Sequence, residues 1–423
     1  MQVDRARYTP SDIGPSPSDW GAPRLSEVST LITNGFVGTA SPFYSNETGV
    51  SYLYGTNVRA NKIDLNNLRY ITREFHQDQQ KTSLRAGDLL TVQSGHIGET
   101  AVVPKHLENA NCHALIVTRL KPKLVNSNFL CQYINSEIGI ARLRGLEVGS
   151  TIAHINTKDL KKFRIPLPPL PEQKKIAAIL ATWDRAIEGT EKLLANSQQQ
   201  KKALMQQLLT GKKRLLGFTG EWKVNRLGEI SSSFTGLSGK TKNDFGSGHK
   251  YITYKNVFLN SCVNINDVEY VEIKTNENQN KLQYGDILFT TSSETPEEVG
   301  MSSVFLYGGD DIFYLNSFCF GFRPKDSLVM NPNFSQFLFR GEEIRRKIQL
   351  LAQGATRYNI SKNKLSEISI NLPPLPEQKA IATVLSTANE EITGIESDLA
   401  RLRQEKKALM QQLLTGKRRV TVD

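Results

Sequence analysis

The chain has 423 residues, 39% of them hydrophobic, and a formal net charge of +11. This length exceeds that of one ordinary core and predicts two or more folded domains. No run approaches the ~20 apolar residues of a membrane span. The four cysteines lie far apart without a C-x-x-C pair, which excludes a disulfide framework or a zinc site and is typical of a cytoplasmic protein. The positive charge permits a polyanionic partner without identifying one.

Residues 1–165 are predicted to form a first domain of mixed strands and helices. Strands are expected where short apolar or β-branched runs occur, and residues 129–144 have the composition of one helix or two. The expected strands are 52–57, 88–93, 100–103 and 115–120.

Residues 166–216 form a second segment, with one long helix predicted over 171–210. It opens with L-P-P-L-P-E-Q at 167–173 and closes with K-K-A-L-M-Q-Q-L-L-T-G-K at 201–212. Pro171 suits the first helical turn, Glu172 suits the positive end of the helix dipole, and Gly211 suits the C′ position. The segment is therefore delimited at both ends by residues that start and stop helices.

Apolar residues recur along this helix at spacings of four and three, from Ile176 to Leu208. A sustained heptad seam predicts a coiled coil. The seam is weaker at Thr190, Ser197 and Lys201, so its middle is either looser or meets another chain.

The second half of the sequence repeats the first. Residues 217–371 match the first domain at apolar and glycine positions, for example Y-L-Y-G-T-N-V at 52–58 with Y-I-T-Y-K-N-V at 251–257. Residues 372–423 repeat the opening at 372–378 and the closing at 406–417, with a helix predicted over 376–415. A period this long indicates a duplicated half-protein rather than a short solenoid repeat.

The predicted fold class is α+β: two mixed α/β domains separated by two long antiparallel coiled-coil helices with pseudo-two-fold symmetry. The simplest partner of each helix is its own duplicate, and the ends of a compact domain often lie close together, which makes the helices antiparallel. The alternative is that each helix packs only on its own domain.

The two kinds of segment have diverged differently. The closings are identical over twelve residues, including positions off the seam, which predicts one kind of partner bound twice. These positions are Lys202, Gln206, Gln207 and Thr210, with their duplicates Lys407, Gln411, Gln412 and Thr415. The globular regions keep their scaffold but differ in polar residues, which predicts two versions of one ligand class.

With its double L-P-P-L-P-E-Q, two long helices and two G-D-[LI]-L modules, the chain resembles the specificity subunit of type I restriction–modification systems. The resemblance covers almost the whole chain after residue 19. It implies that each domain is a target recognition domain reading one half of a split, asymmetric double-stranded DNA site. It also implies that the helices set the gap and dock two methyltransferase subunits, and that this core recruits motor–nuclease subunits.

The resemblance implies a chain without its own catalysis, with S-adenosylmethionine, ATP and Mg²⁺ on the partner subunits and no cofactor here. The motifs agree, since N-P-N-F at 331–334 lacks the second proline of an amino-methyltransferase tetrapeptide, and G-L-S-G-K-T at 236–241 lacks the first glycine of a phosphate loop. The alternatives are a fused methyltransferase or nuclease, a specificity module of another methyltransferase-type DNA defence system, or a coiled-coil adaptor that binds only protein.

Candidate DNA contacts are sought in the regions where the two domains share a scaffold but differ in polar residues. Arg and Lys are chosen there because they read guanine, and Asn and Gln because they read adenine. In the first domain they are Arg59, Asn61, Lys62, Gln93, Ser94, His96, Thr151, His154 and Asn156, with Arg142 and Arg144 for phosphates. In the second they are Lys240, Lys242, Lys255, Asn256, Ser292, Ser293, Thr356, Arg357, Tyr358 and Asn359, with Arg345, Arg346 and Lys347 for phosphates.

Overall fold

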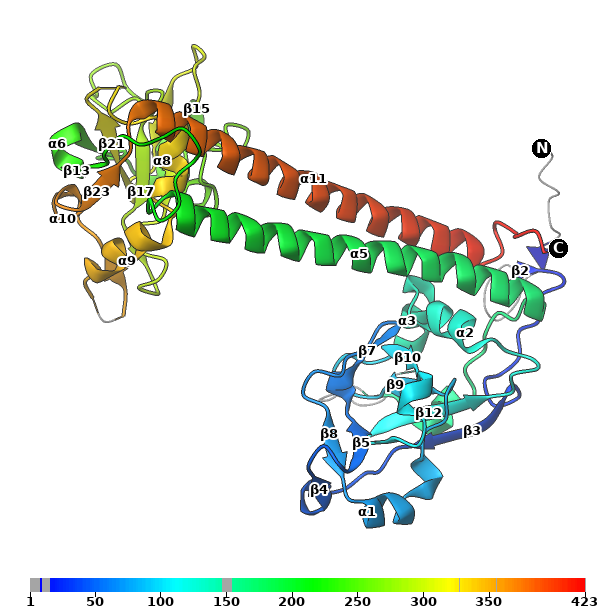
Figure 1. The fold of residues 1–423 in the computed structure, drawn as a ribbon. Helices are drawn as coiled ribbons and strands as arrows, with labels where there is room; N and C mark the ends of the chain where they lie inside the picture. The colour runs from blue at the N-terminus through cyan, green and yellow to red at the C-terminus, as the bar shows by residue number, and fades with distance from the viewer. Residues whose placement is uncertain (1–7, 10–15, 147–153, 327, 355, 423) are drawn as a thin grey trace. The chain divides into compact units, whose positions relative to one another are not determined.

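The computed structural model describes residues 8–9, 16–146, 154–326, 328–354 and 356–422. The chain forms two compact units, Met1–Glu191 with Ser397–Asp423, and Lys192–Glu396. Each unit contains one globular region and parts of both long helices (Figure 1). In the described residues, no helix is long and apolar enough to cross a membrane.

Unit 1 is built on two sheets. The first has the strand order β10-β9-β12-β3 and is antiparallel, and the second has the order β11-β5-β8-β4 with β11 parallel to β5. The strands are β1 Tyr8–Thr9, β2 Ser16–Pro17, β3 Ser29–Asn34, β4 Tyr44–Ser45, β5 Val50–Leu53, β6 Val58–Arg59, β7 Lys62–Ile63, β8 Arg69–Ile71, β9 Leu89–Val92, β10 Thr100–Val102, β11 Asn111–Cys112 and β12 Leu115–Leu120. The helices are α1 Arg73–Asp78, α2 Ser127–Ile134, α3 Glu137–Arg144 and α4 Thr157–Leu160.

Unit 2 repeats this plan, with one sheet ordered β14-β21-β17-β19 and another ordered β16-β15-β20. Here β20 is parallel to β15, as β11 is to β5. The strands are β13 Lys223–Arg226, β14 Ser231–Thr235, β15 Phe245–Ile252, β16 Glu269–Val271, β17 Ile287–Thr290, β18 Ser292–Ser293, β19 Ser302–Val304, β20 Phe313–Leu315, β21 Cys319–Pro324, β22 Tyr358–Asn359 and β23 Ser369–Leu372. The helices are α6 Leu227–Ile230, α7 Tyr254–Leu259, α8 Pro332–Leu338, α9 Glu342–Leu350 and α10 Lys362–Ser366.

The long helices are α5, Leu170–Leu208, and α11, Leu375–Leu413. Both end before a glycine with positive φ, Gly211 at 70° and Gly416 at 72°, which confirms the predicted C-terminal stops. The predicted strand at 52–57 is wrong in its second part, because residues 55–57 form a 3₁₀ turn. The backbone N–H of Tyr54 donates to the side chain of Asn57 and closes that turn.

Within each unit the two long helices pair and run in opposite directions (Figure 1). In unit 1, Lys406 donates to Asp184 (2.5 Å) and Arg403 to Glu191 (2.6 Å). In unit 2, Lys201 donates to Asn389 (2.6 Å), and Ser197 to Glu391 (3.3 Å). Two of the three polar positions of the first seam, Ser197 and Lys201, therefore meet polar side chains of the duplicate helix, whereas Thr190 donates to the carbonyl of Ala186 in its own helix. The predicted antiparallel pairing is confirmed within each unit.

The start of each long helix also packs into the core of the neighbouring globular region. Ile176 and Leu180 join the core of unit 1 beside Phe129, while Ile381 and Leu385 join that of unit 2. At ~25 cal/mol per Å² of buried apolar surface, fully burying each such side chain contributes about 1.5–3 kcal/mol. Each helix therefore packs both on its duplicate and on a globular region.

Candidate functional site

The glutamate of the L-P-P-L-P-E-Q motif is buried at the start of each long helix. In unit 1, Glu172 accepts hydrogen bonds from Nε and Nη2 of Arg419 (2.7 and 2.8 Å) and from Nε1 of Trp20 (3.2 Å). Arg419 also donates to Asp19, and these hydrogen bonds hold the pKa of the Asp19 carboxyl below its usual range. The residues that follow α11 are thereby joined to the start of α5.

Unit 2 builds the same contact from the duplicated residues. Glu377 is fully buried and accepts from Nε and Nη2 of Arg214 (2.5 and 2.6 Å) and from Nε1 of Trp222 (3.2 Å). A bidentate guanidinium–carboxylate pair fixes direction as well as distance. In each unit, the glutamate of the motif therefore connects the start of one long helix, through hydrogen bonds, to the residues that follow the other long helix.

The glutamine of the motif docks the helix onto its globular region. Oε1 of Gln173 accepts from the backbone N–H of Asn126 (2.8 Å), while Nε2 donates to the carbonyls of Leu124 (3.0 Å) and Pro168 (2.8 Å). Gln378 makes the equivalent three bonds in unit 2. These roles were not predicted, although the identity of Glu and Gln in both copies was a usable signal.

In unit 1, five candidate DNA-contacting residues meet where β9 ends. Ser94 pairs with His154 in an isolated antiparallel bridge, and the N–H of Ile155 donates to the carbonyl of Gln93 (3.0 Å). Nη1 of Arg59 donates to Nε2 of His96 (2.6 Å). The segment before α4 and the segment after β9 thus form one polar surface, which we call the unit 1 junction (Arg59, Gln93, Ser94, His96 and His154).

In unit 2, the same connection is made by β18 and β22. Ser292 pairs with Asn359 and Ser293 with Tyr358, and the N–H of Ile360 donates to the carbonyl of Thr291 (2.9 Å). Arg357, just before β22, is exposed. We call this site the unit 2 junction (Ser292, Ser293, Arg357, Tyr358 and Asn359). Its two serines are buried, so the candidates accessible to a ligand here are Arg357, Asn359 and, in part, Tyr358.

Three candidate asparagines are occupied by structural hydrogen bonds. Asn61 has a φ of 63° and accepts from Asn135 (2.8 Å), and Asn156 is the N-cap of α4. Asn256 is fully buried and donates to the carbonyls of Asn264 (2.8 Å) and Asp267 (2.6 Å). Its counterpart Asn57 is also buried and donates to two carbonyls. Asn256 is therefore part of the shared scaffold, which its identity with Asn57 already indicated.

Four candidate basic residues are likewise occupied within their own unit. Arg345 is buried and donates to the carbonyls of Glu297, Val299 and Gly300, and burial lowers its pKa to about 10. The Lys240 side chain is 3% exposed and pairs with Glu277. Arg142 donates to the Tyr133 hydroxyl, and Lys347 pairs with Glu343 (2.9 Å).

The remaining described candidates stay predictions as DNA contacts. Their side chains are exposed at the surface of their unit, where they are accessible to a ligand, although Lys62 lies 4.0 Å from Glu188. These residues are Lys62, Arg144, Lys242, Lys255, Arg346 and Thr356. Thr151 lies outside the described residues.

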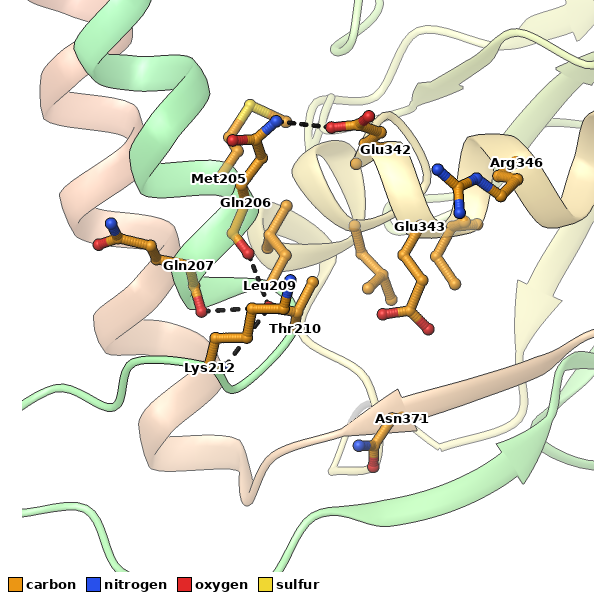
Figure 2. Close-up of a pocket in the computed structure, with 13 residues that line it drawn as sticks. Met205, Gln206, Gln207, Leu209, Thr210, Lys212, Glu342, Glu343, Arg346 and Asn371 are labelled. Carbon is orange, nitrogen blue, oxygen red and sulfur yellow. Dashed lines mark hydrogen bonds between the residues drawn. The ribbon is translucent and has the colours of Figure 1, made fainter.

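Part of the repeated closing contacts its own unit. Figure 2 shows Gln206 donating to Glu342 (2.6 Å) at the start of α9 and Thr210 donating back to the carbonyl of Gln206. In unit 1 the duplicate Gln411 donates to Glu137 (3.1 Å), which also pairs with Lys407 (2.6 Å).

Internal packing therefore explains some of the off-seam identity. Thr415 donates back to the carbonyl of Gln411, as Thr210 does to that of Gln206. Lys202, Gln207 and Gln412 are exposed, and their side chains remain accessible to a partner.

Comparison with known proteins identifies the family. Residues 17–196 and 219–401 match the family model described as the type I restriction modification DNA specificity domain. The chain belongs to this DNA specificity family. Its two matched stretches correspond to the two halves of the duplication, and membership gives the chain a role in the DNA sequence specificity of a type I restriction–modification system.

Individual relatives in this specificity family agree over most of their length. The chain is 28% identical to the putative type I restriction enzyme MjaX specificity subunit of Methanocaldococcus jannaschii, covering 98% of this chain and 97% of that one. It is 26% identical to the EcoKI specificity subunit of Escherichia coli, covering 87% and 82%. The solved type I S subunit from M. genitalium has the same fold, with a TM-score of 0.57, 14% identity and coverage of 93% and 96%.

Proposed function

We propose that each unit reads one half of a split, asymmetric double-stranded DNA site. The observation that carries this proposal is the junction, which is built twice on one scaffold with different polar residues. His154 in unit 1 occupies the place of Asn359 in unit 2, each paired with a serine that follows the G-D-[LI]-L strand. A shared frame with exchanged polar side chains suits two different base sequences, because base edges are distinguished by their donors and acceptors.

The roles of individual residues follow from their exposure and chemistry. Arg59 and Arg357 are exposed and suit guanine, whereas Asn359 and Gln93 have amides suited to adenine. Exposed cations away from the junctions, such as Arg144 and Lys242, suit phosphates, which position the protein without carrying sequence information.

The chain also acts as an assembly core in this proposal. Two methyltransferase subunits dock at the two closings through the exposed Lys202, Gln207 and Gln412, with Lys407 contributing beside Glu137. The motor–nuclease subunits join that complex in the cytoplasm. S-adenosylmethionine, ATP and Mg²⁺ are used by the partners, and this chain performs no catalysis of its own.

A selection experiment tests the DNA-reading role. The full chain, assembled with its methyltransferase subunits, is incubated with duplexes of random sequence, and the bound fraction is sequenced. The expected result is two short sequence blocks separated by a gap of fixed length. A single continuous block, or equal binding to all sequences, would contradict the proposal.

A further inference from the structure

The second sheet of each unit presents one equivalent position with opposite charge. In unit 1, Tyr52 of β5 pairs with Arg69 of β8, and in unit 2, Tyr251 of β15 pairs with Glu269 of β16. The two strands are otherwise alike. In each, the charged residue is followed by a tyrosine and then by a fully buried apolar residue, which is Ile71 in unit 1 and Val271 in unit 2. Arg69 and Glu269 therefore occupy the same place on one duplicated scaffold.

Arg69 is held at the surface by two aromatic rings. Its guanidinium carbon lies 4.8 Å from the ring centre of Tyr44 and 5.6 Å from that of Tyr54. The hydroxyls of these tyrosines are hydrogen-bonded to each other, and the Tyr54 ring stacks on His113 at 4.8 Å. The Arg69 side chain is exposed, and within the described part of the chain no carboxylate forms a salt bridge with it. Stacking orders the guanidinium plane and leaves its N–H donors available.

Glu269 is also oriented by a tyrosine. The hydroxyl of the buried Tyr251 donates to Oε2 of Glu269, whose side chain is exposed. A carboxylate that has one oxygen fixed in this way retains acceptor capacity for a ligand. Both units thus hold a charged group of defined orientation at the same position.

Each position is connected to the junction of its unit. In unit 1, Tyr54 is followed by Gly55, whose carbonyl lies 3.1 Å from Nε2 of His96. In unit 2, the hydroxyl of Tyr254, shortly after β15, donates to the carbonyl of Ser292 (2.6 Å). In unit 1 the Tyr54 ring that contacts Arg69 is thus linked to the junction, and in unit 2 a residue shortly after the strand that faces Glu269 contacts the junction.

The exchange of charge distinguishes bases from backbone. A phosphate attracts Arg but repels Glu, so a position facing phosphates in both units would not suit Glu269. Base edges offer both kinds of group, with guanine O6 and N7 accepting from Arg and cytosine N4 donating to a carboxylate. We propose that this position determines sequence specificity, with Arg69 reading guanine in one half-site and Glu269 reading cytosine in the other. The inference rests on the proposed function, in which each unit reads one half-site.

The test uses the changes Arg69→Gln and Glu269→Gln, each of which replaces a charged group with a neutral amide, in the full chain with its methyltransferase subunits. Selected DNA is sequenced, and binding is measured at several salt concentrations. Because an amide suits adenine, Arg69→Gln should replace a guanine preference at one position of one block, and Glu269→Gln a cytosine preference in the other. The expected change in preference is about 5- to 150-fold, corresponding to one good base contact. Arg73→Gln and Glu272→Gln, at exposed positions nearby, are matched controls that should leave both blocks unchanged.

The contrary outcomes are distinct. If Arg69→Gln weakens binding to all sequences alike and makes the salt dependence shallower by about one unit, Arg69 contacts a phosphate and the inference is wrong. If Glu269→Gln tightens binding to all sequences alike, Glu269 only repels the backbone, which also overturns it. If the parent chain selects two blocks and neither variant alters them, this inference fails while the proposed function stands. If the parent chain shows no sequence preference, both fail.

Discussion

Replacing the motif glutamine in Gln378→Glu should destabilise unit 2 selectively. Gln378 is 1% exposed, and its Nε2 donates to the carbonyls of Val329 and Pro373, both at 2.9 Å. A carboxylate donates to neither carbonyl. Leaving two buried carbonyls without a partner costs about 1–3 kcal/mol each, so unfolding of unit 2 should become easier by roughly 3 kcal/mol or more. Oxygen–oxygen repulsion adds to this cost.

The loss should depend on pH in a defined direction. The buried carboxyl introduced in Gln378→Glu has a raised pKa in the folded chain, compared with ~4.3 for an exposed glutamate. The part of the destabilisation that comes from the charge is therefore fully present above the folded-state pKa and is lost as the pH falls below ~4.3, where the carboxyl is protonated in both states. A neutral carboxyl donates a single O–H, so one of the two carbonyls still lacks a donor at low pH.

Urea unfolding followed by hydrogen exchange in separate peptides measures this effect in the full chain. Protection should fall in α8 and remain unchanged in α2, and the equivalent change Gln173→Glu should do the reverse. Lys379→Ala, at an exposed residue of the same helical turn, is the control. A change in unfolding free energy below about 1 kcal/mol for Gln378→Glu, or equal loss of protection in both units, would refute the reasoning.

Three further predictions follow from the site. Asn256→Ala should destabilise unit 2 by about 2–4 kcal/mol, because two carbonyls lose their donor. Urea unfolding measures this loss, and Lys255→Ala is the control that should leave stability unchanged. Equal stability of the two variants would contradict the scaffold role. Arg345→Ala should lower the melting temperature without altering the salt dependence of DNA binding, since its guanidinium is occupied by carbonyls, and a shallower slope would instead mark a phosphate contact. Lys202→Glu should weaken one of the two proposed methyltransferase sites. Native mass spectrometry should then show loss of the complex that carries two methyltransferase subunits. A parent complex that carries a single methyltransferase subunit would contradict the proposed assembly.

The long helices were predictable because their signals are local. A proline in the first turn, a heptad seam and a glycine at C′ placed α5 and α11 within two residues of their observed ends. The division of residues 129–144 into α2 and α3 depends on Ser136, which caps α3 through the N–H of Gly139 (3.1 Å). Such a cap is a short-range signal, but the composition of the segment alone did not reveal it.

The site was less predictable, because whether a polar side chain is free to contact DNA or is already bound within its own unit depends on residues distant in the sequence. Arg345 looks like a phosphate contact in sequence, yet its partners lie in residues 297–300. Lys240 likewise pairs with Glu277. Arg69 was not predicted, because its strand matches that of Glu269 over a short stretch of sequence and the equivalence becomes clear from strand register. The identity of Asn256 with Asn57 in the two halves is a sequence signal for the scaffold, because both side chains are buried and donate to two carbonyls.

The central claim is that each unit specifies one half of the DNA site. The most direct test is to map methylated adenines produced by the chain with its methyltransferase subunits, comparing the parent with Arg59→Gln in unit 1 and Arg357→Gln in unit 2. The account predicts that each variant changes one block of the recognised sequence, a different block for each, and leaves the gap unaltered. A variant that changes both blocks, or two variants that change the same block, would contradict it.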